Sequence, residues 1–171
     1  MFRSIPYLGM TLVLLFLQIF ILDELSIAMW LRPMLFPLIV LLLPMEWRTI
    51  WVLLSTLAIG IIMDAALGGA GLYTATLLPL VVTRRWILYV TTGRSVESGD
   101  QASLLWRMPM RQLIIYAAAM LGLHHTLFFT LETLSFAHPL RLVATILFST
   151  LLSVVIAWPV LRLFVSKIVT K

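Results

Sequence analysis

Long apolar runs separated by short polar breaks follow one another along the whole chain. A helix that crosses a membrane needs about 20 consecutive, mostly apolar residues. Six runs approach that length and are predicted to be transmembrane helices: 5–22, 27–43, 49–67, 69–83, 113–134 and 142–165. The polar breaks leave little chain for a soluble domain. We therefore expect an all-α, polytopic membrane protein that forms one integral membrane domain over residues 1–171.

The second run is the least regular of the six. Its uninterrupted apolar part, 34–43, is only ten residues long. Three prolines bracket it, namely Pro33, Pro37 and Pro44. A helix that begins at Ile27, with the Arg32 side chain extended toward the headgroups, has about 17 residues and is just long enough to cross. A re-entrant segment is the alternative interpretation.

Composition agrees with the apolar pattern, because 62% of the residues are hydrophobic and only 11% are charged. Soluble domains average about 25% charged residues. These values argue against a cytosolic enzyme, a nucleic-acid-binding module and a secreted disulfide scaffold. The net charge of +5 requires no nucleic acid, since basic cytoplasmic loops account for it. The chain has no cysteine, so it has neither disulfides nor a thiol nucleophile.

The basic residues are distributed unevenly over alternate connections of the six predicted helices. One side receives Arg3, Arg48, Arg84, Arg85, Arg94, Arg107, Arg111, Arg162, Lys167 and Lys171. The other side receives only Arg32 and Arg141. Because cytoplasmic loops carry an excess of Lys and Arg, both termini and a basic loop at about 84–112 are expected to be cytoplasmic. The arginines of this loop are interpreted as topology determinants, with contact to a filament or to lipid as the alternative.

The densest motif is a small-residue stretch at the end of the third run, residues 60–72. Gly60, Asp64 and Gly68 are four residues apart and share one helical face. Small side chains allow another backbone to approach closely, which favours helix association in lipid. Gly68, Gly69 and Gly71 permit a tight turn into the fourth helix. An intramembrane acid such as Asp64 is a candidate for partner, ligand or proton contact, and the alternative is that it caps the turn or the next helix.

A second candidate cluster lies on the fifth predicted helix. His125 and Glu132 are seven residues apart and share a face, while His124 points about 100° away from His125. A helical zinc site needs ligands three or four residues apart, so this spacing does not predict a metal site. Three interpretations stay open: residues that pin helix packing or lie at the outer interface, a polar pocket or partner contact, and metal binding or catalysis.

Other catalytic signatures are missing from the sequence. Ser55, Thr56, Thr74, Thr76, Ser149 and Ser153 are scattered on apolar helices. Hydroxyls in such positions usually bond to the carbonyl of the preceding turn. There is no phosphate-binding loop, no dinucleotide fingerprint and no HExxH motif. The sequence therefore predicts a protein that is not an enzyme and uses no cofactor.

Three segments together resemble one known family. They are LLFLQIFIL (14–22), PMLFPLIVLLLP (33–44) and, most specifically, GIIMDAALGGAGLYTATLLPLV (60–81). These segments resemble the rod shape-determining protein MreD family of small bacterial inner-membrane proteins. The segment HHTLFFTLE (124–132) is similar to the fifth helix of the Bacteroidetes-type branch.

The resemblance implies a non-enzymatic scaffold of the elongation (rod) complex that helps to maintain cell shape. Family members work with the bitopic protein MreC, with a SEDS glycosyltransferase and an elongation-specific class B transpeptidase, and indirectly with MreB filaments. The family is also similar in fold to the six-helix substrate-binding (S) subunits of energy-coupling-factor vitamin transporters. A transporter subunit is therefore the alternative function, although likeness of fold does not decide function. Lipids are expected partners, and nucleic acid is not.

Overall fold

The computed structural model describes residues 5–23, 31–45, 47–93, 108–134 and 138–169, and these residues are predominantly helical. The elements are α1 (Ile5–Leu17), its π-helical continuation η2 (Gln18–Leu22), α2 (Pro37–Leu42), α3 (Thr49–Leu67), α4 (Leu72–Thr92), α5 (Met110–Thr133) and α6 (Pro139–Val169). Within the described residues, three helices are long and apolar enough to cross a membrane: α3, α5 and the part of α6 from Pro139 to Leu163. The predicted all-helical class is confirmed.

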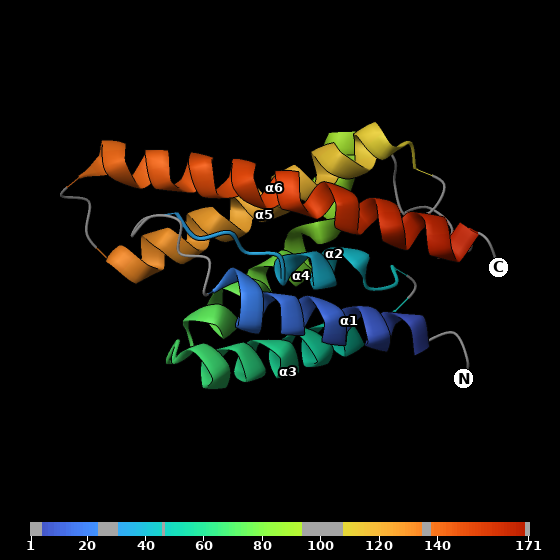
Figure 1. Cartoon of the computed structure of the whole chain (residues 1–171), viewed down its shortest axis with the longest axis horizontal. Coiled ribbons are helices and arrows are strands. Elements are labelled where there is room, and N and C mark those ends of the chain that lie inside the picture. The colour runs from blue at the N-terminus through green and yellow to red at the C-terminus, as the bar shows by residue number, and fades with distance from the viewer. Residues whose placement is uncertain (1–4, 24–30, 46, 94–107, 135–137, 170–171) are drawn as a thin grey trace.

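The helices run back and forth along one long axis (Figure 1). α1, α3 and α5 run in one direction, and α2, α4 and α6 run in the other. The beginning of α1 and the end of α6 therefore lie together, at what we call the terminal end of the molecule. The end of η2, the α3–α4 turn and the end of α5 lie at the opposite end.

Helix α2 occupies the centre of the bundle. It packs against α1, α4 and α5, while α3, α4, α5 and α6 pack pairwise in chain order. All six of its side chains are buried. The outer helices expose large apolar side chains, among them Leu12, Phe16, Trp51, Ile61, Leu147 and Leu151. A surface of this kind suits contact with lipid, because a soluble protein rarely exposes so much contiguous apolar area.

The second predicted helix, 27–43, is wrong as a continuous helix. Of its described residues, 31–43, only the six of α2 are helical, and residues 32–35 before it are not. Residues 24–30 lie outside the described part of the chain. Proline explains the break, because Pro33 has no N–H to donate and disfavours helical conformation in Arg32 before it. Pro37 has no N–H either and stands in the first turn of α2, where that N–H would have no helical partner.

The fourth helix extends further along the chain than the predicted range 69–83, so the basic loop predicted at 84–112 begins later. Helix α4 continues through Arg84 and Arg85 to Thr92 and ends at Gly93, which adopts a left-handed conformation (φ 67°). The two arginines therefore lie inside a helix and do not begin a loop. Of the predicted loop, residues 94–107 lie outside the described residues, and α5 begins at Met110.

Candidate functional site

Asp64, in the last turn of α3, binds the first turn of α4. Its Oδ1 accepts the backbone N–H of Tyr73, at 3.0 Å. Its Oδ2 accepts the backbone N–H of Thr74 at 3.0 Å and the Thr74 hydroxyl at 2.6 Å. Unpaired N–H groups and the positive end of the dipole lie at a helix N-terminus, so a carboxylate is stabilising there. The structure thus places Asp64 as a cap of the next helix, one of its two predicted roles.

The glycines of the 60–72 block allow the tight turn and the close helix contact that bring Asp64 to the start of α4. Gly68 ends α3 with φ 69°, and Gly71 precedes α4 with φ 93°, a conformation in which side chains other than glycine are strained. A Cβ on Gly69 would collide with the Tyr73 ring and the Asp64 carboxylate. A Cβ on Gly60 would lie 2.7 Å from the Cα of Thr74. Helices α3 and α4 therefore meet at Gly60 closer than any larger residue allows.

A groove of about 620 Å³ opens on the outer surface beside this turn. Small side chains make up most of its lining, which comprises Ile61, Asp64, Ala65, Ala70, Gly71, Thr74 and Ala75. Ala65 on α3 and Ala75 on α4 are both exposed. The predicted small-residue block thus forms both an internal helix contact and an external concave face.

Side chains of η2 and α6 satisfy the backbone of the non-helical segment before α2. The Gln18 amide donates to the carbonyl of Pro33 at 3.3 Å, and its oxygen accepts the N–H of Leu35 at 2.7 Å. Ser149 accepts the N–H of Arg32 at 3.3 Å, and Ser153 accepts that of Met34 at 2.9 Å. In a bilayer, irregular backbone is tolerated only where protein supplies such partners. These four bonds therefore allow the chain to pass through the bundle without a helix.

The expectation that the hydroxyls bond to their own helix holds for some residues and fails for others. Ser55 and Thr76 do bond to the carbonyl of the preceding turn. Ser149 and Ser153 bond to the non-helical segment instead, and Thr74 bonds to Asp64. Thr56 is buried, and its hydroxyl has no hydrogen-bond partner among the described residues. For Ser149, Ser153 and Thr74 the cause is the same, because a neighbouring backbone or carboxylate competes for the hydroxyl.

His125 supports Ser153 from helix α5. Its Nδ1 lies 2.7 Å from the carbonyl oxygen of Leu121, and its Nε2 lies 3.4 Å from the Ser153 hydroxyl. Because a carbonyl only accepts, the hydrogen is assigned to Nδ1, and Nε2 then accepts from Ser153. Ser153 can accept the Met34 N–H at the same time. His125 is thus the third member of a chain that runs from α5 through α6 to the central segment.

His124 takes part in an aromatic cluster and not in this polar chain. It is fully buried, and neither ring nitrogen has a hydrogen-bond partner among the described residues. The rings of His124 and Phe36 are nearly perpendicular, with centroids 5.0 Å apart, and the Phe128 ring centroid lies 6.0 Å from that of His124. The described residues contain no group of three His, Asp or Glu side chains that could hold a metal ion.

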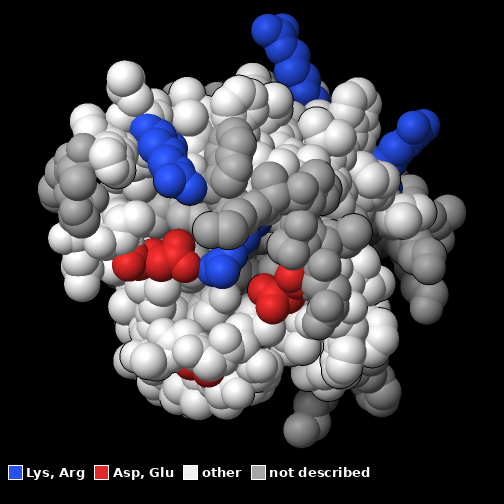
Figure 2. Space-filling view, turned by 60° about the vertical axis from the view of Figure 1, so that its left-hand side comes forward, with Lys and Arg blue, Asp and Glu red and all other residues white. Residues whose placement is uncertain are grey.

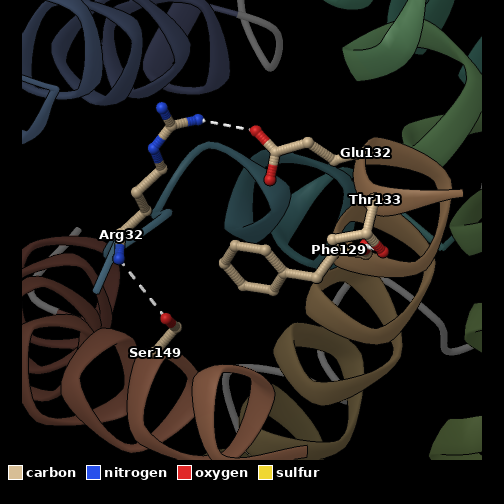
Figure 3. A network of polar contacts seen from close by, with 5 residues as sticks. All are labelled: Arg32, Phe129, Glu132, Thr133 and Ser149. Carbon is tan, nitrogen blue, oxygen red and sulfur yellow. Dashed lines mark hydrogen bonds and ion pairs between the residues drawn. The ribbon is translucent and has the colours of Figure 1, made fainter. Parts of the chain in front are cut away.

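Glu132 pairs with Arg32 and not with a histidine. The Arg32 Nη1 and Glu132 Oε1 atoms are 2.9 Å apart, with 49% and 35% of the two side chains exposed. Figure 3 shows that Arg32 connects two helices, its side chain reaching Glu132 on α5 and its backbone N–H reaching Ser149 on α6. A cavity of only about 10 Å³ lies on another side of Arg32, beside Gln18 and Tyr73. It has room for roughly one water molecule.

Arg84 is a buried charge whose structural role the sequence interpretation missed. Its side chain is 2% exposed, and its guanidinium donates to the carbonyls of Val40 and Leu43 at 3.3 Å and of Pro44 at 3.1 Å. These carbonyls lie at the end of α2, where unpaired acceptors and the negative end of the dipole favour a cation. The apolar residues that follow Arg85 are the one sequence signal that the helix continues past the charges.

Comparison of the chain with protein-family models, with curated proteins and with solved structures finds no match in any of the three.

Proposed function

We propose that the chain crosses the bacterial inner membrane six times, with both termini in the cytoplasm. The second crossing is supported by its length. At the rise of an extended chain the five residues 31–35 cover about 17 Å, and α2 together with Phe36, whose backbone is helical, adds about 10 Å. The sum is close to the hydrocarbon thickness of about 30 Å. The ten-to-two distribution of basic residues supports the orientation.

Single cysteines test this topology cleanly, because the chain has none of its own. Arg111→Cys places a thiol at the terminal end, and Leu134→Cys places one at the opposite end. A membrane-impermeant maleimide added to cells with a permeabilised outer membrane should label only Leu134→Cys. Labelling of Arg111→Cys under the same conditions would reverse the orientation.

Given this membrane topology, we infer that the protein is a non-enzymatic scaffold of the elongation complex, as its resemblance to the MreD family implies. The observation that carries this proposal is the small-residue groove between α3 and α4. In lipid, helices associate through close packing of small residues and not through hydrophobicity. The groove therefore suits the single transmembrane helix of a bitopic partner such as an MreC-like protein.

Co-purification with the MreC-like protein of the same organism tests the scaffold role. Ala65→Leu and Ala75→Leu fill the groove and should abolish retention of the partner, and cells that depend on either variant should become round. Ala66→Leu is the matched control, because Ala66 is exposed on the same helix but does not line the groove. If both groove variants retain the partner, the groove is not the docking site. If depletion of the protein leaves rod-shaped cells unchanged, the scaffold role is wrong.

A transporter subunit receives less support from the site. The three polar residues that suggested a ligand pocket, Asp64, His125 and Glu132, are each bonded within the chain. Mass spectrometry of the purified protein separates the two functions. A tightly retained vitamin, together with an associated cassette ATPase, would replace the scaffold proposal.

A further inference from the structure

Two exposed arginines, Arg48 just before α3 and Arg85 on α4, lie at the same level along the helix axes. These helices are antiparallel, and Gly60 faces Thr74 across their contact. Arg48 is twelve residues before Gly60, and Trp86 is twelve residues after Thr74. Arg48 is therefore level with Arg85 and Trp86 at the terminal end of the molecule.

Two more exposed arginines reach the same end from α5 and α6. Gly122 faces Thr150 across the contact of these helices, because a Cβ on Gly122 would lie 3.8 Å from the Thr150 methyl group. Arg111 is eleven residues before Gly122, and Arg162 is twelve residues after Thr150, so the two arginines are level. The Tyr116 hydroxyl donates to the carbonyl of Arg84 at 3.3 Å. Tyr116 is five residues after Arg111, so the two pairs of arginines lie within about 8 Å of each other along the helix axis. We call Arg48, Arg85, Arg111 and Arg162 the arginine ring.

The ring lies among exposed aromatic side chains. Trp51, Trp86, Tyr89 and Trp158 are 54–66% exposed and lie on α3, α4 and α6. Trp and Tyr are enriched where headgroups meet hydrocarbon, because their rings are apolar with one polar atom. The combination of arginine and aromatic residues at one height is typical of a membrane–water interface.

The acidic side chains within the described ranges lie at the other end. Asp23, Asp64 and Glu132 are the acidic side chains that the structure describes, and each lies where η2, α3 or α5 ends. Figure 2 brings that end forward and shows acidic side chains with a basic one between them, as the Arg32–Glu132 pair requires. Among the described residues, the arginine ring therefore has no carboxylate at its own level.

We propose that the arginine ring binds the phosphate groups of anionic phospholipids in the cytoplasmic leaflet. All four members are arginines, whose planar fork donates two parallel hydrogen bonds to a phosphate. Helices α3 and α6 lie on opposite sides of the bundle, with α4 and α5 between them (Figure 1). Charges spread over the perimeter in this way fit lipids that surround the protein, whereas a single acidic protein would cover one side. This inference rests on the proposed membrane topology and not on the scaffold role.

The test is a thermal unfolding assay on the full chain in a neutral detergent. Micelles doped with phosphatidylglycerol should raise the melting temperature by several degrees, and micelles doped with phosphatidylcholine should not. The quadruple variant Arg48→Gln, Arg85→Gln, Arg111→Gln, Arg162→Gln should lose at least two thirds of that shift. Arg141→Gln is the matched control, because Arg141 is exposed at the opposite end, and it should keep the full shift.

A second measurement covers the case in which the quadruple variant does not fold. Two double variants, Arg48→Gln with Arg85→Gln and Arg111→Gln with Arg162→Gln, should each retain about half as many phosphatidylglycerol molecules as wild type in native mass spectra. An unchanged lipid count in both would overturn the proposal, as would an equal shift with phosphatidylcholine.

Two further ligands separate phospholipid from other anions. Inorganic phosphate should produce no more than a small fraction of the phosphatidylglycerol shift, and polyglutamate should not displace the retained lipid. Stabilisation by polyglutamate but not by phosphatidylglycerol would assign the ring to an acidic protein instead. Partner binding measured on the same double variants should be unchanged, so a failed lipid result leaves the scaffold proposal standing and the reverse also holds.

Discussion

Thr74 donates both its hydroxyl and its backbone N–H to the same carboxylate oxygen of Asp64, at 2.6 and 3.0 Å. This relationship closes the α3–α4 turn from outside α4, because the capping residue belongs to the preceding helix. Gly71, which stands at the usual capping position, has no side chain to offer. The cap and the close contact at Gly60 therefore act on the same helix pair.

Removal of this cap should destabilise the protein measurably. Loss of a capping side chain costs about 0.5–2 kcal/mol, so Asp64→Ala should lower the free energy of unfolding by that amount. Asp64→Asn keeps one acceptor oxygen and should lose about half as much. Chemical denaturation in detergent micelles measures both. Asp23→Asn serves as control, because Asp23 is exposed at the same end; an Asp64→Ala protein as stable as this control would contradict the capping role.

Substitution at Gly60 tests the close approach of α3 and α4. Gly60→Ala places a methyl group 2.7 Å from the Thr74 Cα, and because that atom is backbone, the helices must separate. We expect a loss of about 1–3 kcal/mol, the usual cost of overpacking. In Gly9→Ala, on α1, the added methyl group meets nothing within 4 Å. That variant should gain up to about 1 kcal/mol from helix propensity. Equal stability of the two variants would show that α3 and α4 leave room for a methyl group at Gly60, which would contradict the close contact with Thr74.

Ser153 should matter more than an ordinary helical hydroxyl. Ser153→Ala leaves the buried N–H of Met34 without its acceptor, and an unsatisfied buried group costs about 1–3 kcal/mol. Thr150→Val is the matched control on the same helix, because the Thr150 hydroxyl bonds only to the Ile146 carbonyl of its own helix, which also serves the helix backbone. Thermal unfolding in micelles should separate the two variants by several degrees. A Thr150→Val protein that unfolds as early as Ser153→Ala would remove the special role of the serine.

The sequence predicts features that depend on nearby residues and misses those that depend on distant ones. The helical class follows from long apolar runs, and the turn at 68–71 follows from its glycines. Gln18 is bonded to Leu35, seventeen residues away, and Ser153 to Met34, 119 residues away. No local pattern reveals such partners. The prolines do mark the segment before α2 as irregular, but a continuous helix was predicted because, without such partners, an irregular segment would leave unpaired polar groups in lipid.

In the candidate site, too, the local pattern was predicted and the distant partners were not. Asp64 and its glycines were found because a carboxylate beside a glycine-rich turn is a local pattern. His125 and Glu132 do share helix α5, but they have different partners, Ser153 and Arg32, contributed by elements far away in sequence. Two turns of helix separate them by about 10 Å along the axis, so one is buried in the bundle and the other reaches the surface.

Arg84 provides the sharpest test of how the central helix is fixed. Arg84→Lys keeps the charge, but one ammonium group cannot reproduce the fork that reaches Val40, Leu43 and Pro44. We expect a loss of about 2 kcal/mol or more, because hydrogen bonds to charged groups contribute about 1.5–3 kcal/mol each. Arg85→Lys is the matched control, since Arg85 is exposed and makes a single 3.4 Å contact with the Met45 carbonyl.

The Arg84→Lys substitution should also loosen the end of α2 locally, in addition to lowering the stability of the whole protein. Hydrogen exchange measured by mass spectrometry should increase in peptides that cover 37–45, because the last carbonyls of α2 lose their donors. Peptides from the α3–α4 turn should be unaffected, since Asp64 closes that turn independently of Arg84. Uniformly faster exchange over the whole chain would instead mean that Arg84 stabilises the bundle without fixing α2 in particular.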